Sequence, residues 1–513
     1  MISLFCTKTA INPSIKCHIN PIYPTRTTVV KMTFYIYALL ILFSQQLLAR
    51  DIWTPEQAWT WFNAQKPYIM GTELTVSSAA NQLEMWQAET FDADLIDKEI
   101  SFGSKLGFTV FRIFLHDLVY FHDPTGFKSR MNTVLNSLDK YGMKALFVFF
   151  DTENIDTNPT LGQQPKPLPA KCNSVYAYSP NITILNDPSK HEILKPYIID
   201  VVGTFANDSR VLAWDVYNEP GIGGSDHGNP VQEKLLQLVF EWARSANPTQ
   251  PLTSPIMFNT LAQPIQANNS DVISTHIYTN AAGFERFIKN CTQYQRPIII
   301  TEFLARGPIS SYFSNILPLG KQYNVGMIAW GHVVGKTEWN MPWDSWHNGV
   351  SYVEYPPTVW FQDIFRQDGE PYLREEAQIV KRLNGCPLGY HSKVNNWTCY
   401  NAYDTPKSWA DVQAACQSDW SYPVTINNAF ENSDVKTYAS SLTNCNGFYI
   451  GLSQVRNTWK WPMTVPYNNP SYRNWKTGNP TNDANANCVV LNPSDGSWSN
   501  QDCSTQRCYI CSY

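Results

Sequence analysis

Two glutamates in this chain of 513 residues have the type and placement needed to cleave a glycosidic bond. Glu219 follows the apolar run 211–217 in Asn-Glu-Pro, and Glu302 ends the run 297–301 in Ile-Thr-Glu-Phe. A glycosidase uses one carboxyl group to protonate the leaving oxygen, and a second one to attack the anomeric carbon or to activate water there. The pair therefore predicts a sugar-cleaving site with one protonated and one ionised glutamate.

The elements around these glutamates alternate between apolar strand-like runs and helix-like stretches. Near-continuous apolar runs are typical of parallel strands covered on both faces. Roughly eight alternations predict an α/β fold, a (β/α)8 TIM barrel, over residues 51–383. A doubly wound open sheet is the alternative, but no Gly-x-Gly-x-x-Gly turn follows the first strand. The expected strands are 106–115, 144–150, 211–217, 271–276, 298–301 and 325–330, and the expected helices are 93–105, 129–140, 231–246 and 282–289.

The ordered motifs at the strand ends resemble a retaining glycoside hydrolase of the clan A superfamily, closest to the cellulase-like and mannanase-like family 5. They are Asn218-Glu219-Pro220, His276-Ile-Tyr278, Thr301-Glu302-Phe303 and Trp330. The resemblance implies that Glu219 is the acid/base and Glu302 the nucleophile. It also implies substrate-binding or orienting roles for five further residues, namely Arg112, Asn218, His276, Tyr278 and Trp330.

The implied roles are specific. Asn218 binds the substrate's 2-hydroxyl, Arg112 keeps Glu302 ionised and Tyr278 orients it, while His276 and Trp330 line the cleft. Each motif also has a structural interpretation: the proline starts a helix, Arg112 forms an ion pair, and the histidine and tryptophan are core residues. The order of the whole set at strand ends favours catalysis.

One departure from the family concerns the ends of the second and third strands. Asp151 stands where His or Asn is usual, and His116 and Asp117 follow the second strand. The segment 152–181, rich in proline and polar residues, is expected to be a rim loop that shapes the cleft.

The C-terminal segment 386–513 contains eight of the twelve cysteines, which predicts a disulfide framework and an oxidising compartment. Eight cysteines alone allow 105 pairings. The segment also resembles a C-type lectin-like domain, a small α+β fold, in Trp409-Ala-Asp-Val-Gln-Ala-Ala-Cys416, Tyr449-Ile-Gly-Leu452 and Trp459-Lys-Trp461. The resemblance implies the bridges Cys386 with Cys399, Cys416 with Cys511, and Cys488 with Cys503. It leaves Cys445 and Cys508, whose pairing is open, for a fourth.

Sugar binding in C-type lectins commonly depends on calcium held by carboxylates and amides. Here Gly478-Asn-Pro-Thr481, Trp498-Ser499-Asn500 and Ala486 supply no acidic side chain where the family carries its ligands. We therefore expect no metal site in this domain. It would bind protein or glycan through another face; Trp459, Trp461 and Trp475 are candidates for that face, with core packing as their structural alternative.

The N-terminal residues 1–50 are expected to be a signal peptide with an upstream extension, because the apolar run 34–43 has the length and flanks of a signal core. A membrane anchor over residues 34–48 is the alternative, although an anchor needs about 20 apolar residues. Sequons at Asn181, Asn207, Asn268, Asn290 and Asn396 agree with secretion. We expect a secreted, extracellular protein without membrane contact after signal cleavage.

Three functions remain in view. The first is a secreted retaining β-glycanase acting on a polysaccharide or oligosaccharide such as β-glucan, mannan or xylan, with a lectin-like accessory module. The second is a non-catalytic protein that recognises carbohydrate or protein, and the third is another enzyme class on the same barrel. No cofactor is expected, and the formal charge of −5 without a basic run excludes a nucleic-acid partner. The glycan, endo or exo action, the oligomeric state and the pairing of Cys172 and Cys291 are open.

Overall fold

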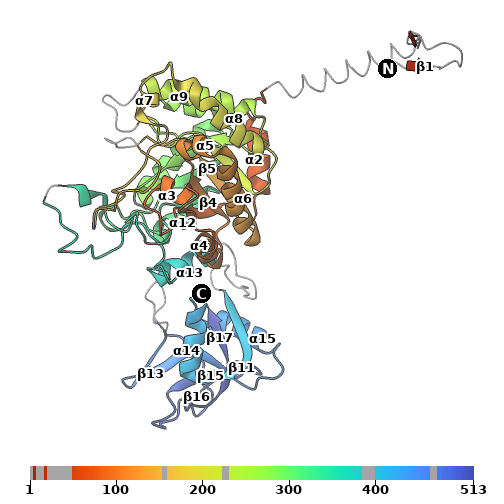
Figure 1. Ribbon diagram of the computed structural model, residues 1–513. Helices are drawn as coiled ribbons and strands as arrows, with labels where there is room; N and C mark the ends of the chain where they lie inside the picture. Colours follow the sequence, from red (N-terminus) through yellow and green to blue (C-terminus); the bar gives the residue numbers. More distant parts are fainter. Residues whose placement is uncertain are drawn as a thin grey trace.

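The computed structural model describes residues 4–6, 17–19, 49–66, 68–152, 159–221, 230–347, 349–383, 399–462 and 471–512. Two bodies follow one another along the chain, a larger one up to residue 383 and a smaller one from residue 399 (Figure 1). Ahead of them β1 (Leu4–Cys6) and β2 (Cys17–Ile19) pair antiparallel. The run 34–43, on which the predicted signal peptide rests, lies outside the described residues.

The larger body contains an eight-stranded parallel sheet, in the order β7-β6-β5-β4-β3-β10-β9-β8. Its edge strands β7 and β8 also meet, because Asp271 N donates to Leu252 O over 2.8 Å and Ile256 N to Ser274 O over 2.7 Å. The sheet is therefore a nearly closed barrel. Its strands are β3 (Met70–Glu73), β4 (Val110–Phe114), β5 (Lys144–Val148), β6 (Val211–Asp215), β7 (Leu252–Thr253), β8 (Ile273–His276), β9 (Ile298–Glu302) and β10 (Gly326–Ala329).

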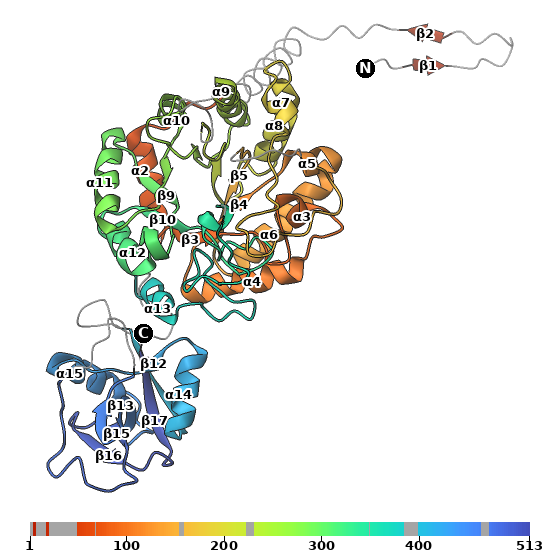
Figure 2. The same cartoon turned by 90° about the vertical axis from the view of Figure 1, so that its left-hand side faces the viewer.

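Helices surround this sheet, as Figure 2 shows. At least one helix follows each strand of the sheet, so every strand is covered from outside by the helix that returns the chain. The helices are α2 (Pro55–Ala64), α3 (Gln82–Trp86), α4 (Ala93–Leu106), α5 (Asp117–His122), α6 (Pro124–Lys140), α7 (Ile182–Leu185), α8 (Lys195–Thr204), α9 (Pro230–Ser245), α10 (Gln263–Asn269), α11 (Ala281–Cys291), α12 (Phe313–Gln322) and α13 (Arg374–Leu383).

Local sequence explains where several elements begin and end. Asp92 caps α4 by accepting from Leu95 N, and Gly107 ends the helix in a left-handed conformation with φ 83°. The expected strand 106–115 was therefore wrong at its start, because residue 106 still belongs to α4 and β4 begins at Val110. Gly71 lets β3 approach β4 closely, since an added Cβ would lie 1.8 Å from Val110 O.

Two strands escaped the sequence pattern. β7 has only two residues, too few to show a period, and β3 carries Gly, Thr and Glu in place of an apolar run. Both lie buried, so tertiary packing rather than local hydrophobicity makes them strands. Within the described ranges, no helix combines the length and the apolar character required to cross a membrane.

The smaller body is an α+β domain with a sheet in the order β11-β17-β13-β15-β16, to which β12 and β14 add at β17 and β13. Its strands are β11 (Tyr400–Lys407), β12 (Tyr422–Pro423), β13 (Phe448–Val455), β14 (Thr458–Lys460), β15 (Cys488–Leu491), β16 (Trp498–Gln501) and β17 (Arg507–Ser512). Its helices are α14 (Trp409–Ser418) and α15 (Ala429–Ala439).

Disulfides join the strands and α14 of this domain. The expected bridges Cys416–Cys511 and Cys488–Cys503 are confirmed, and Cys445 pairs with Cys508. Cys399 is also disulfide-bonded, whereas its expected partner Cys386 lies outside the described residues. In the larger body Cys172 and Cys291 are buried and form no disulfide with each other.

The two bodies touch through Trp420, which follows α14 and is 4% exposed. Its ring lies 5.6 Å from that of Phe365, and the ammonium groups of Lys105 and Lys381 lie 5.8 and 5.2 Å from its centroid. Lys381 Nζ also donates to Asp419 O over 3.1 Å. Residues from α4 and α13 thus hold the smaller domain against the larger one.

Candidate functional site

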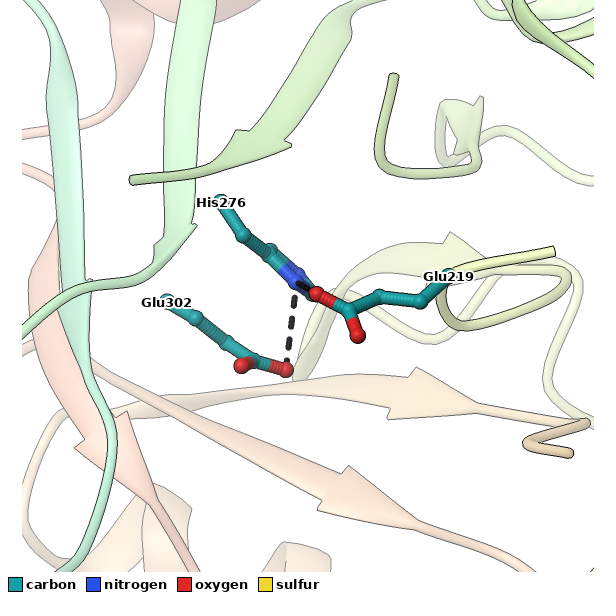
Figure 3. A group of neighbouring side chains, drawn as sticks. All are labelled: Glu219, His276 and Glu302. Carbon is teal, nitrogen blue, oxygen red and sulfur yellow. Dashed lines mark hydrogen bonds and ion pairs between the residues drawn. The ribbon is translucent and has the colours of Figure 1, made fainter. Parts of the chain in front are cut away.

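The two candidate glutamates meet at the carboxyl end of the barrel, where β7 and β8 separate the strands that carry them. Glu302 is the last residue of β9, and Glu219 lies in the loop that follows β6. Figure 3 shows both side chains pointing toward His276, the last residue of β8. One ligand-type atom from each of the three side chains lies within 4.8 Å of the others. The sheet thus brings together residues that are far apart in the sequence.

His276 stands between the two carboxyl groups. Its Nδ1 lies 2.5 Å from Glu219 Oε1, and its Nε2 lies 3.4 Å from Glu302 Oε1. Burial lowers the pKa of His276 to about 3, although the nearby Glu302 acts in the opposite direction. The imidazole is therefore neutral at ordinary pH, and its tautomer decides which partner donates in the contact with Glu219.

Glu302 is fixed from two sides. Arg112 Nη1 donates to its Oε1 over 2.8 Å, and the Tyr278 hydroxyl donates to its Oε2 over 2.7 Å. Both contacts are those expected from the sequence. Donors aimed at both oxygens stabilise the ionised carboxylate and fix its orientation.

Two buried carboxyl groups beneath this pair were not predicted. Arg112 also lies 3.4 Å from Glu73 Oε2 and 2.8 Å from Asp215 Oδ2, and all three side chains are fully buried. Burial raises the pKa of Glu73 well above its usual range and also raises that of Asp215, against the attraction of Arg112. An acidic residue inside a buried strand was the available signal: Asp215 interrupts the apolar run 211–217.

Asn218 and Glu219 are positioned through the backbone as well as through side chains. Asn218 N donates to Phe150 O over 2.7 Å, and its Oδ1 accepts from Arg112 Nη2 over 2.7 Å. Glu219 has φ 44°, a left-handed conformation that is uncommon for a residue with a side chain. Such strained positions cluster at functional sites, and this one turns the Glu219 side chain back over the sheet.

Aromatic side chains form one wall beside the pair. Trp330 follows β10, half-buried, with ring centroids 5.8 Å from Phe114 and 4.8 Å from Trp339. Trp343, in the short 3-10 helix Trp343–Trp346, packs 4.9 Å from the Tyr278 ring and is 44% exposed. An exposed indole next to the tyrosine that orients Glu302 can stack against a sugar ring.

The described part of the expected rim loop, residues 159–181, docks on this aromatic wall. Trp346 Nε1 donates to Cys172 O over 2.8 Å, and Asn173 N donates to Thr337 O over 2.8 Å. Asp117 and Asp151, which depart from the family pattern, both bind this loop. Ser179 Oγ donates to Asp117 Oδ1, and Asp151 pairs with Ser179 through the backbone. His116 is buried and accepts from Leu118 N as the cap of α5.

In the smaller domain, a hydrogen-bonded amide occupies the region where C-type lectins commonly hold calcium. Asn500 Oδ1 accepts from Thr481 N over 2.7 Å, and its Nδ2 donates to Thr481 O over 3.1 Å and to Ala486 O over 2.8 Å. One buried amide therefore ties the loop 481–486 to β16 through neutral hydrogen bonds. Nearby, Trp461 is buried, and Trp459 and Trp475 pack half-buried against the core. Much of the surface of these three tryptophans therefore serves core packing.

The comparisons with known proteins concern this smaller domain. A family described as Lectin C-type domain matches residues 405–513. The perlucin-like protein of Mytilus galloprovincialis is 30% identical over 129 residues, which cover 81% of that protein and 25% of this chain. The chain belongs to the C-type lectin domain family.

Other members are similar to the same C-type lectin domain. Human C-type mannose receptor 2 is 26% identical over 161 residues, which are 28% of this chain but only 10% of the receptor. Among solved structures, the carbohydrate-recognition domain of the mouse scavenger receptor C-type lectin is 25% identical, with 95% of that chain and 25% of this one covered and a TM-score of 0.22. Human lithostathine is 24% identical, with 90% and 25% covered and a TM-score of 0.23.

Proposed function

We propose that the N-terminal body is a (β/α)8 barrel that hydrolyses β-glycosidic bonds with retention of configuration. One observation carries the proposal: one carboxyl oxygen of Glu219 and one of Glu302 lie within 4.8 Å of each other at the carboxyl end of the barrel. Carboxyl groups of retaining enzymes lie about 5 to 5.5 Å apart, whereas inverting enzymes leave room for a water between them. The short separation supports attack by one carboxylate itself.

The contacts assign the two roles. Glu302 accepts from Arg112 and Tyr278, so it is the ionised nucleophile, while Glu219 faces the neutral His276 and is the proton donor. In the tautomer with hydrogen on Nε2, Glu219 donates its proton to Nδ1. When Glu302 becomes esterified and loses its charge, Glu219 is free to ionise and to activate the incoming water.

The substrate is a polysaccharide or oligosaccharide whose reacting ring binds between Asn218 and Trp330. Asn218 presents its amide NH2 while Arg112 holds its oxygen, which fits donation to the 2-hydroxyl of the sugar. Trp343 extends the apolar face along the rim. This placement supports binding of several sugar units across the mouth of the barrel.

Two variants test the mechanism. Glu302→Ala should lower turnover by several orders of magnitude, and Glu219→Gln should hurt substrates with poor leaving groups most. Glu89→Gln, at an exposed position, is the matched control and should retain full turnover. Purified β-glucan, mannan, xylan and aryl glycosides serve as substrates, and NMR of the first product should show retention. Full activity of either site variant would disprove the assignment.

The C-type lectin domain gives the second proposed activity, which is binding of a glycan. The family match supports it, and the firm contact at Trp420 holds this binding domain beside the barrel. Attachment to a glycan raises the effective concentration of substrate for a linked catalytic domain. A chain that binds glycans with no turnover on any substrate would instead be a recognition protein.

We also propose that the protein is secreted after removal of residues 1–50. The disulfides of the lectin domain support an oxidising compartment. Arg50 pairs with the buried Asp271 over 2.5 Å, a contact that removal of residues 1–50 would break and that cleavage after Ala49 would keep. The N-terminal sequence of protein recovered from culture medium tests the cleavage position.

A further inference from the structure

A ring nitrogen between the two glutamates has no hydrogen-bond partner among the described residues. His276 Nε2 is buried, and its contact with Glu302 Oε1 at 3.4 Å does not have the geometry of a hydrogen bond. The whole His276 side chain is 2% exposed. A buried ring nitrogen that faces a carboxylate oxygen without bonding it is an unsatisfied ligand atom.

The spacing of these two atoms matches a shared metal ion. In a tetrahedral zinc site with metal–ligand bonds of about 2.0 to 2.1 Å, neighbouring ligand atoms lie about 3.3 Å apart. The Nε2 to Oε1 distance of 3.4 Å is that of two ligands on one ion. Glu219 offers a third ligand atom within 4.8 Å of the other two, and to bind the ion it would have to leave its contact with His276 Nδ1.

The carboxyl groups of the site can compensate a bound cation only at its outer edge. Arg112 pairs with Glu302, and burial raises the pKa of Glu73 and of Asp215, which disfavours their ionisation. A cation that binds between Glu219 and Glu302 would therefore displace the proton of Glu219. A divalent ion between Glu219 and Glu302 would neutralise the two outer carboxylates in a site with little water.

The donor set selects the kind of ion. One imidazole nitrogen and two carboxylates, with room for a water in the fourth position, suit Zn²⁺ and ions of similar softness. Mg²⁺ prefers octahedral oxygen ligands, and Ca²⁺ takes six to eight oxygens, so three ligands including a nitrogen disfavour both.

We propose that Glu219, His276 and Glu302 form a binding site for one Zn²⁺ per chain, and that occupancy blocks the candidate active site. The bound ion takes the nitrogen and both carboxylates, so neither glutamate can give a proton to or attack a substrate. Zn²⁺ is then a reversible inhibitor that competes with substrate, not a cofactor. Binding itself does not depend on whether the barrel hydrolyses glycans.

Calorimetric titration of the full-length protein with Zn²⁺, after chelator treatment and dialysis, tests the proposal. The wild type should bind one Zn²⁺, and His276→Ala and Glu219→Gln should each weaken this binding more than about tenfold. Titration with Co²⁺ should give the visible absorption of a four-coordinate ion in the wild type only. His122→Ala, at an exposed histidine, is the control that should bind as the wild type does.

Several outcomes would overturn the proposal. They are no saturable Zn²⁺ binding, equal affinity in the wild type and both site variants, or equal affinity for Mg²⁺. Glu219→Gln nearly preserves the shape of the side chain, so it decides the question if His276→Ala does not fold. Zn²⁺ binding without turnover on any glycan would leave the site intact and reject the proposed hydrolysis. Turnover that is unaffected by Zn²⁺ would reject inhibition at this site and leave the proposed hydrolysis intact.

Discussion

Arg112 Nη1 lies 2.8 Å from Glu302 Oε1, and the guanidinium that makes this contact is completely buried. The same group bonds Asp215 and Asn218 and approaches Glu73. A planar guanidinium with five donors can serve partners in several directions, which the ammonium of lysine cannot do with the same geometry. Arg112 therefore links the strand that carries it to the residues around both glutamates.

Replacement of Arg112 by Met should destabilise the protein by about 3 to 5 kcal/mol, because the buried carboxyl groups of Glu73 and Asp215 would lose the guanidinium that pairs with them. Urea unfolding followed by tryptophan fluorescence measures the effect. Lys128→Met removes the partly exposed pair with Asp200 and should change stability by less than about 1 kcal/mol. Equal effects of the two variants would show that the buried network contributes nothing special.

The neutral state of His276 predicts a pH dependence of stability. The unfolded chain takes up a proton on this residue near pH 6.5, whereas the folded protein does so only at about 3. The unfolded state therefore binds more protons between these values, and stability falls as pH drops through this window by about 1.4 kcal/mol per unit. Urea unfolding of wild type and His276→Gln at several pH values isolates the residue. A constant difference between the two proteins would contradict the assignment.

The amide of Asn500 predicts a lectin domain that is ordered without calcium. Asn500→Ala removes its bonds to Thr481 and Ala486 and should lower stability by about 2 kcal/mol or more, since buried partners are left unsatisfied. Asn485→Ala, at an exposed position in the same loop, is the control. Scanning calorimetry with calcium and with EDTA should give the same midpoint for the wild type. A midpoint raised by calcium would show that a cation site exists.

The contact at Trp420 predicts that the two domains stabilise each other. Trp420→Ala leaves a cavity against Phe365 and should reduce stability by about 3 to 5 kcal/mol. Calorimetry of the full chain should show the barrel and lectin transitions moving apart, because the shared contact is lost. Phe430→Ala changes a side chain that is 77% exposed and should leave the curve unchanged. Unaltered transitions for Trp420→Ala would mean that the domains unfold independently.

The sequence by itself determined the parts of this protein that depend on local pattern and chemical type. Helix α4 was predicted within one residue, because a capping Asp and a Gly with a left-handed conformation mark its ends. The bridges Cys416–Cys511 and Cys488–Cys503 followed from the resemblance of the segment to C-type lectin-like domains. Glu219 and Glu302 were singled out because their type suits one reaction and each follows or ends an apolar run, whereas the resemblance to family 5 pointed to His276 and Tyr278.

Only the tertiary structure decided which distant residues share an environment. Glu73 lies on a strand with no apolar pattern, and its place beside Arg112 arises because β3 and β4 pair in parallel. The packing of Trp420 against Phe365 and the separation of Cys172 from Cys291 are likewise set by how whole domains and elements pack. Burial, pKa and contact depend on neighbours brought together from across the chain, and no short stretch of sequence encodes those neighbours.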